Sequence, residues 1–118
     1  MIVDDDEVNS MTVSSYLKVK GYRVLLAKDG KEAIALTKAH KPDLILMDIQ
    51  MPVMDGLEAT RQIRLDPNLV DIPIIALTAL AMAGDRERFL EAGASDYLAK
   101  PVKLKNLAKM VQTLLERV

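Results

Sequence analysis

The sequence predicts an α/β domain in which strands and helices alternate and the strands form one parallel sheet. Short apolar runs alternate with longer amphipathic segments in the order βαβαβαβαβα. The apolar runs are nearly continuous, which is typical of strands that are covered by helices on both faces. Strands that alternate with helices are joined by right-handed crossovers, and such crossovers produce a parallel sheet. A chain of 118 residues is about the size of one domain.

Five segments are predicted to be strands from their apolar content, the fifth more weakly than the others. In chain order they are Met1–Val3, Tyr22–Ala27, Leu44–Met47, Ile74–Leu77 and Asp96–Ala99. The first is short, because an acidic run begins directly after Val3, whereas a strand usually has about five or six residues. We therefore expect residues 1–118 to form a single domain whose first strand is clipped, as in a domain excised from a longer protein.

The segments between the strands are predicted to be helices, because they are amphipathic and are bounded by glycine, proline or aspartate. They are residues 8–19, Lys31–His40, Leu57–Leu65, Ala83–Ala92 and 104–118. One face of the first helix contains Val8, Thr12, Tyr16 and Val19. The residues of the second helix that can pack inward are Ala33, Ile34 and Leu36. The apolar stripe of the last helix is Leu104, Leu107, Val111, Leu114 and Val118.

The composition excludes several classes of function. The chain has no cysteine, which rules out disulfides, thiolate zinc sites, iron–sulfur clusters and thiol nucleophiles and fits a cytoplasmic location. There are 16 basic and 17 acidic residues, the basic ones are scattered, and aromatic residues make up 3%, so we expect no direct binding to nucleic acid. The longest apolar stretch, from Ile74 to Ala83, is too short to span a bilayer, so we expect no membrane insertion.

Polar residues follow four of the predicted strands at their carboxyl ends, where parallel α/β sheets bind their ligands. Asp4 and Asp5 come after the first strand, Asp48 after the third, Thr78 after the fourth and Lys100 after the fifth. Carboxylates gathered at one rim repel one another, and a hard divalent cation with oxygen ligands relieves that repulsion. The sequence therefore predicts a Mg²⁺ site that includes the three aspartates.

Some polar residues near this rim have a simpler interpretation. Asp6 and Glu7 lie past the strand end, where they suit the cap and first turn of the following helix. A solvated acidic helix start remains an alternative for the whole run from Asp4. His40, the only histidine, is expected at the surface, neither as a ligand nor as a base.

The combination of residue types at the rim suits phosphoryl transfer. A carboxylate can act as a nucleophile toward phosphorus and form an aspartyl phosphate. Such a transfer depends mainly on positioning and charge neutralisation, which a metal ion, an ammonium group and a hydroxyl group provide. Asp48, the Asp4–Asp5 pair, Lys100 and Thr78 would supply these parts. Taken alone, Asp48 is also explained as a turn cap, Thr78 as an ordinary strand residue and Lys100 as a surface lysine.

Several segments resemble one known family, in the family's order and with its spacing. They are residues 3–9 (VDDDEVN), 42–48 (PDLILMD), 51–56 (MPVMDG), 74–79 (IIALTA) and 96–101 (DYLAKP). On these segments the sequence resembles the receiver domain of two-component response regulators over essentially its whole length. The most specific signal is Asp48 followed by Met51–Gly56. The resemblance implies a flavodoxin-like, doubly wound (βα)5 fold with strand order 2-1-3-4-5 and helices on both faces of the sheet.

The resemblance also implies roles for the acidic residues. Asp48 is implied to accept a phosphoryl group from a phosphohistidine on a histidine kinase or a histidine phosphotransfer protein. Asp5 is implied to bind Mg²⁺ directly and Asp4 to bind it through water. The backbone carbonyl of Gln50 would be a further ligand, and Mn²⁺ is an alternative metal.

A second group of residues is implied to respond to the phosphoryl group. Thr78, Lys100 and the backbone N–H of Ala79 would contact its oxygens. Thr78 and Tyr97 match the family's switch pair, in which the hydroxyl moves inward and the ring follows. The surface of the fourth helix, fifth strand and fifth helix then changes shape for an output partner. Without this role Tyr97 would be a half-buried tyrosine on an edge strand. A cis peptide bond is implied before Pro101.

The activity implied is self-phosphorylation from a phosphodonor and self-dephosphorylation, both dependent on Mg²⁺, rather than conventional enzymatic turnover. Gln50 and Leu80 lie two residues after Asp48 and Thr78, and because neither supplies a base we expect slow self-dephosphorylation. The output partner is not identified by the sequence. The chain is expected to be a monomer or a weak homodimer.

Two other interpretations remain open. In a phosphohydrolase of the haloacid-dehalogenase type, Asp4 would be the nucleophile and Asp6 the acid/base, but this leaves Asp48 and Met51–Gly56 unexplained. In a receiver-like binding module without phosphotransfer, rim residues would be missing, whereas the matched ones are all present here.

Overall fold

The computed structural model describes residues 1–49, 55–79 and 85–116. Within these residues lies a five-stranded parallel sheet of order β2-β1-β3-β4-β5, which confirms the predicted fold class. The strands are β1 (Ile2–Val3), β2 (Leu26–Ala27), β3 (Ile45–Asp48), β4 (Ile74–Thr78) and β5 (Asp96–Ala99). The helices are α1 (Glu7–Val19), α2 (Gly30–His40), α3 (Gly56–Arg64), α4 (Asp85–Ala92) and α5 (Leu104–Leu115). The predicted helical positions 83, 84, 117 and 118 lie outside the described residues.

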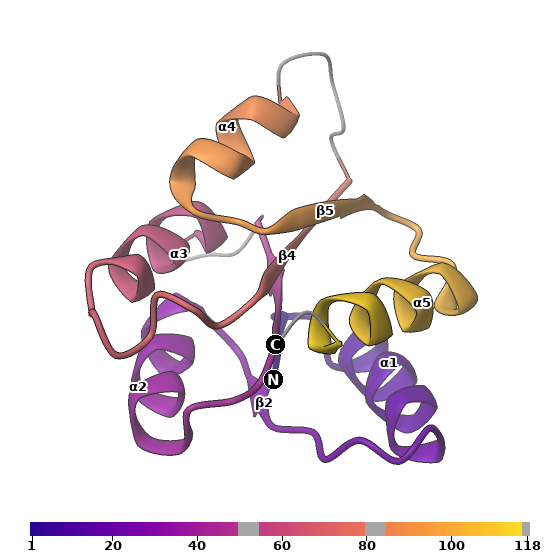
Figure 1. The fold of residues 1–118 in the computed structure, drawn as a ribbon. Helices are drawn as coiled ribbons and strands as arrows, with labels where there is room; N and C mark the ends of the chain where they lie inside the picture. Colours follow the sequence, from indigo (N-terminus) through magenta and orange to yellow (C-terminus); the bar gives the residue numbers. More distant parts are fainter. Residues whose placement is uncertain (50–54, 80–84, 117–118) are drawn as a thin grey trace.

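The helices cover both faces of the sheet (Figure 1). Helices α1 and α5 pack on one face, where Leu17 and Leu107 meet Leu46 and Ile75. Helices α2 and α3 pack on the other face, and α4 lies on that side near β5. Strands β3 and β4 are buried along their whole length, which explains why their sequences are continuous apolar runs.

Aspartate side chains fix the starts of the first three helices. Asp6 accepts hydrogen bonds from the backbone N–H groups of Val8 (3.0 Å) and Asn9 (3.2 Å). Asp29 and Asp55 accept equivalent bonds at the starts of α2 and α3, each at 2.8 Å. These bonds satisfy N–H groups that have no partner inside the helix. The predicted role of Asp6 as a helix cap is therefore observed.

The prediction of the packing face of the first helix is wrong. Val8 and Val19 are 76% and 85% exposed, and the buried residues of α1 are Ser10, Val13, Ser14 and Leu17. Two of these four buried residues are serines, so the buried stripe of α1 is not purely apolar. Periodicity in apolar residues alone therefore points to the wrong side of this helix.

The second predicted strand is much shorter than the expected Tyr22–Ala27. Strand β2 is an edge strand that pairs with β1 alone, in the register Ile2↔Leu26 and Val3↔Ala27. Since β1 itself consists of two residues, it offers no partner for a longer β2. Tyr22 and Val24 are still partly buried, against the α1–α5 side of the core.

No helix among the described residues is long and apolar enough to cross a membrane.

Candidate functional site

The polar residues predicted for the rim do meet at the carboxyl edge of the sheet. Asp4 follows β1, Asp48 ends β3, Thr78 ends β4 and Lys100 follows β5. The parallel register places Asp48 opposite Leu77 and Thr78 opposite Ala99, so the ends of the three adjacent strands are level. Asp4, Asp48 and Thr78 are buried, with exposed fractions of 4%, 2% and 2%.

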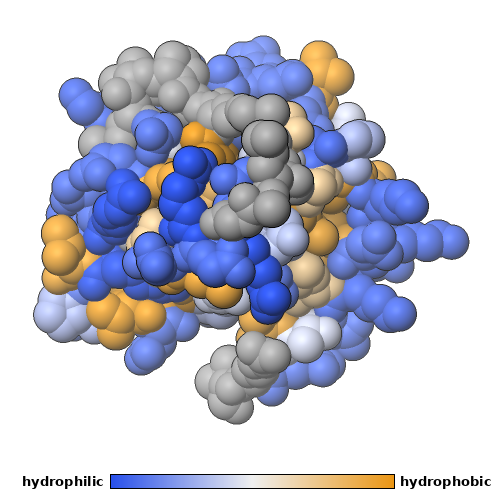
Figure 2. All heavy atoms as spheres, turned by 90° about the horizontal axis from the view of Figure 1, so that it is seen from above, coloured by the Kyte–Doolittle hydropathy of each residue, from blue (hydrophilic) through white to orange (hydrophobic). Residues whose placement is uncertain are grey.

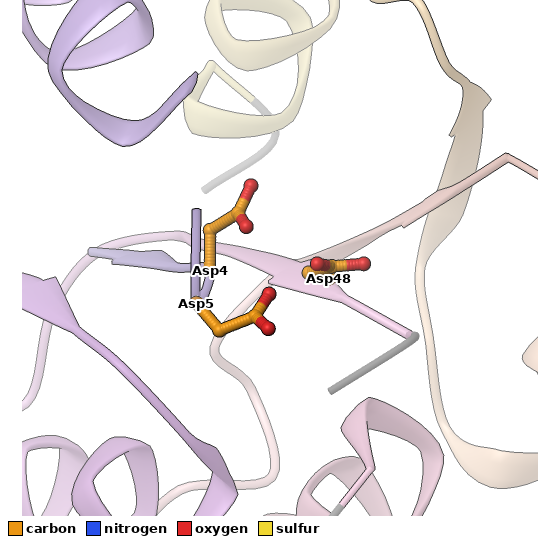
Figure 3. A group of neighbouring side chains, drawn as sticks. All are labelled: Asp4, Asp5 and Asp48. Carbon is orange, nitrogen blue, oxygen red and sulfur yellow. The ribbon is translucent and has the colours of Figure 1, made fainter. Parts of the chain in front are cut away.

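Three carboxylates form the centre of this site (Figure 3). One oxygen from each of Asp4, Asp5 and Asp48 lies within 4.8 Å of the others. Asp5 is exposed, whereas the other two are buried, so the cluster opens to solvent on the Asp5 side. The donor set consists of oxygens alone, which suits a hard cation such as Mg²⁺ and not a thiolate- or imidazole-preferring metal.

The carboxylate of Asp4 is held by the chain itself. Its Oδ1 accepts a hydrogen bond from the backbone N–H of Asp6 (2.9 Å), and its Oδ2 accepts one from Asn9 Nδ2 (2.6 Å). A buried carboxylate needs such donors, because an unsatisfied charge is costly away from water. Asn9 belongs to the motif quoted from the sequence, but sequence reasoning gave it no role.

Lys100 supplies the positive charge of the site. Its Nζ lies 3.2 Å from Oδ2 of Asp48 and 3.7 Å from Oδ2 of Asp4, and its side chain is 25% exposed. The backbone N–H of Lys100 donates to the Thr78 carbonyl (2.7 Å), which fixes the start of the side chain beside β4. The peptide bond from Lys100 to Pro101 is cis. Because one ammonium faces a cluster of three carboxylates, the group retains an excess of negative charge that a divalent cation would offset.

Gly56 lets α3 approach the end of β3, and sequence reasoning gave it no role beyond the turn. Its N–H donates to the Ile49 carbonyl (3.1 Å). A Cβ at this position would meet the carbonyl oxygen of Asp48 and would lie 2.9 Å from both the Asp48 carbonyl carbon and Ile49 Cα. The sequence signal for this close approach of α3 to β3 is the glycine itself, which directly follows Asp55 at the start of the helix.

The two residues of the implied switch lie on neighbouring strands. Thr78 is buried at the end of β4, and Tyr97 is half-buried on the edge strand β5, in register with Ala76. The ring centroids of Tyr97 and Phe89 of α4 are 6.0 Å apart at an interplanar angle of 56°. Phe89 is a further residue that sequence reasoning missed. Its position links the edge strand to α4.

Further positions named from the sequence lie outside the described residues. These are Gln50, with its expected carbonyl ligand, residues 51–54 of the quoted motif, and Leu80. Ala79 is described and exposed, directly after the buried Thr78. His40 is exposed at the end of α2, as expected.

A model of the response regulator receiver domain family matches residues 1–112 of the chain. The polar-differentiation response regulators DivK of Brucella anthropi and Brucella ovis are each 40% identical to it over 115 residues, which are 98% of this chain and 94% of theirs.

Solved structures of receiver domains share the fold. The signal receiver domain of a signal transduction histidine kinase from Syntrophus aciditrophicus superposes with a TM-score of 0.91 at 38% identity, covering 99% of this chain and 89% of that one. The receiver domain of a sensor histidine kinase from Pseudomonas aeruginosa PAO1 gives a TM-score of 0.90 at 45% identity, covering 98% and 94%. That structure has a magnesium ion coordinated in its active-site cleft.

Proposed function

The chain belongs to the response regulator receiver domain family of two-component signalling, and from this premise we propose that Asp48 is its phosphoacceptor. One observation carries the proposal: the Asp48 carboxylate lies in a cluster of three carboxylates within 4.8 Å, with Lys100 Nζ 3.2 Å away. The unit proposed to perform this function is a single receiver domain over residues 1–118. The haloacid-dehalogenase alternative is not favoured, because the Asp6 carboxylate is occupied as the cap of α1.

The proposed metal is Mg²⁺, with Mn²⁺ as an alternative of similar oxygen preference. Asp5 is exposed and would bind it directly, and Asp48 would be a second ligand. Both oxygens of Asp4 already accept hydrogen bonds from Asp6 and Asn9, which favours binding by Asp4 through water. The carbonyl of Gln50 remains a proposed ligand. When bound, the cation would offset the repulsion among the carboxylates and neutralise phosphoryl oxygens.

In the proposed reaction an Asp48 carboxylate oxygen forms a bond to phosphorus while the P–N bond of a partner's phosphohistidine breaks. The electron pair of that bond stays on the imidazole nitrogen, which takes a proton from solvent. Lys100 would contact a phosphoryl oxygen, since its ammonium is already beside Asp48. The Thr78 hydroxyl and the backbone N–H of Ala79 would donate to other oxygens. Transfer of the phosphoryl group from Asp48 to water would then complete the cycle. This cycle is not conventional enzymatic turnover.

The proposed output is a change in the surface of α4, β5 and α5. Phosphorylation adds a charge of about −2 beside Thr78. The hydroxyl would turn toward it, and Tyr97 would move into the space left at the end of β4. Since the Tyr97 ring packs against Phe89, this movement would reach α4.

Receiver domains interact with histidine kinases and with output partners. For this chain the proposed phosphodonor is a histidine kinase or a histidine phosphotransfer protein. We further propose a cytoplasmic monomer or weak homodimer that does not bind nucleic acid directly, in keeping with its formal charge of −1 and its scattered basic residues.

The test is to incubate the chain with Mg²⁺ and acetyl phosphate and to locate the modified residue by mass spectrometry. We expect the label on Asp48, its loss when EDTA removes the metal, and its loss in Asp48→Asn. Asp6→Asn is the matched control, because Asp6 caps α1 near the site, and it should keep the label. A label on Asp4 would instead support the hydrolase interpretation, and no label at any residue would refute the proposal.

A further inference from the structure

Arg64, the last residue of α3, joins two separate segments of the chain. Its Nε donates a hydrogen bond to the Gly93 carbonyl oxygen (2.8 Å), and its Nη1 donates to the carbonyl oxygens of Leu69 (3.2 Å) and Val70 (2.9 Å). Partial burial lowers the pKa of the Arg64 guanidinium, while the nearby charge of Asp71 acts in the opposite direction. An arginine is suited to this task because its planar fork holds several donors in fixed directions.

Gly93 has no side chain, and this leaves room for the side chain of Arg64. Its φ is +112°, and a Cβ at this position would lie 2.5 Å from Arg64 Cγ. The aliphatic part of the arginine therefore lies against bare backbone. The same glycine ends α4, since its N–H donates to the Leu90 carbonyl (3.0 Å) and the next N–H, of Ala94, donates to the Phe89 carbonyl (3.0 Å). Arg64 thus contacts the turn that closes α4.

Ser95 holds the same turn to the sheet. Its N–H donates to the Ile74 carbonyl (2.7 Å), and its Oγ accepts from the Ile74 N–H (3.1 Å). The buried residues of α4 are Phe89 and Ala92, both in its second half. Seen from the α4 side, the surface is mainly hydrophilic, with hydrophobic residues in small separate groups (Figure 2). The hydrogen bonds of Arg64 and Ser95 therefore hold the turn at the C-terminal end of α4.

We propose that Arg64 is a positioning residue for the signalling surface: it anchors the turn at Gly93, so that Phe89 keeps its place against Tyr97. The link to signalling rests on the proposed phosphorylation switch, whereas the anchoring of the turn concerns the unphosphorylated chain as well. Phe89 contacts Tyr97 one turn before Gly93, and the N–H of Ala94 donates to the Phe89 carbonyl. A loosened turn would therefore loosen the contact through which a movement of Tyr97 reaches α4.

Hydrogen exchange of the full chain, measured by mass spectrometry, tests the anchor. Arg64→Gln removes the charge, and Arg64→Lys keeps the charge and the stem but cannot bond both segments at once. Arg61→Gln is the matched control, because Arg61 is an exposed residue of the same helix, paired with Glu58 at 3.4 Å. In both Arg64 variants we expect amides of residues 89–95 to exchange at least about tenfold faster, while β3 amides and the control stay close to the wild type.

The link to the switch is tested in the same proteins after phosphorylation by acetyl phosphate with Mg²⁺. In the wild type, exchange should change in α4, whereas in both Arg64 variants that change should be at least about twofold smaller. A uniform rise over all strands and helices would show a merely structural role and overturn the proposal, as would an undiminished change in α4, wild-type exchange at 89–95 or failure of both Arg64 variants to fold. If the wild type is not phosphorylated, the proposed function fails, but the exchange of the unphosphorylated variants still decides the anchor.

Discussion

Replacing Gly56 by alanine tests whether the close approach of α3 to β3 holds the site in place. The added Cβ would meet the Asp48 carbonyl oxygen and lie 2.9 Å from the Asp48 carbonyl carbon and from Ile49 Cα. These atoms belong to the backbone at the end of a buried strand, and Gly56 is also tied to Ile49 by a hydrogen bond of 3.1 Å. No side chain can rotate away to make room, so the backbone of Asp48 or the start of α3 must shift.

Two effects of this substitution oppose each other. Alanine is favoured over glycine within a helix by about 0.5–1 kcal/mol. Overpacking a rigid neighbour typically costs about 1–3 kcal/mol, and carbon atoms normally approach to about 3.5–4.0 Å. Because the Gly56 contacts are much shorter than that and involve backbone, we expect the overpacking to prevail, with a net destabilisation of about 2 kcal/mol. For a domain of this size this corresponds to a fall in Tm of about 8 °C.

Urea unfolding, monitored by far-ultraviolet circular dichroism, measures the stability of the protein. The rate of phosphorylation by acetyl phosphate measures whether the site still functions. Gly21→Ala is the control, because Gly21 has a φ of +97° but an added Cβ there would have no neighbouring atom within 4 Å. The control should lose about 1–2 kcal/mol from backbone strain and keep wild-type phosphorylation. Gly56→Ala should lose both stability and most phosphorylation of Asp48. A Gly56→Ala protein as stable as the wild type, or one phosphorylated at the wild-type rate, would refute the reasoning.

Three further outcomes follow from the charges. Asp48→Asn keeps the shape of the cluster but removes one of its like charges, so without Mg²⁺ it should be more stable by about 1 kcal/mol in urea unfolding, and Mg²⁺ should stabilise it less than the wild type. Lys100→Met removes the ammonium 3.2 Å from Asp48, and since this lysine is partly exposed we expect a loss of about 1–2 kcal/mol that Mg²⁺ partly restores. Burial lowers the pKa of the Met1 α-amino group, which donates to Leu44 at 2.8 Å, from 8.0 to about 6. The unfolded chain then binds more protons between these values, so stability of the 118-residue chain should fall by about 2 kcal/mol from pH 8 to pH 6. An acetylated N-terminus should lack this dependence.

The positions of the buried strands and of the site could be predicted because they depend on simple patterns. β3 and β4 are buried on both faces, so their sequences are unbroken apolar runs. A polar residue that ends such a run, like Asp48 or Thr78, must emerge at the carboxyl edge of the sheet. The family resemblance then assigned the order of the strands, which periodicity alone does not determine.

The features that were missed depend on contacts between segments. The buried stripe of α1 contains Ser10 and Ser14, and nothing in an apolar pattern distinguishes buried serines from exposed ones. The bond from Asn9 to Asp4 depends on how α1 leaves the sheet. Likewise, Arg64 looks like an ordinary basic residue at a helix end. Its partner Gly93 lies 29 residues further along the chain, so their contact appears only when the fold is known.

The structure places a charged site at the end of a buried central strand and a weakly buried helix near the edge of the sheet. Asp48 lies at the end of a fully buried strand. In the proposed switch the effect of added charge there would pass along the ends of the strands, from Asp48 to Thr78 and then to β5, which is half-buried and has a single neighbouring strand. From β5 the contact between Tyr97 and Phe89 leads to α4. Because phosphorylation can favour an active state only through interactions that differ between two states, we expect that difference to arise in these edge elements. An Arg64 that anchors the turn at Gly93 would then preserve the contact through which the change reaches α4.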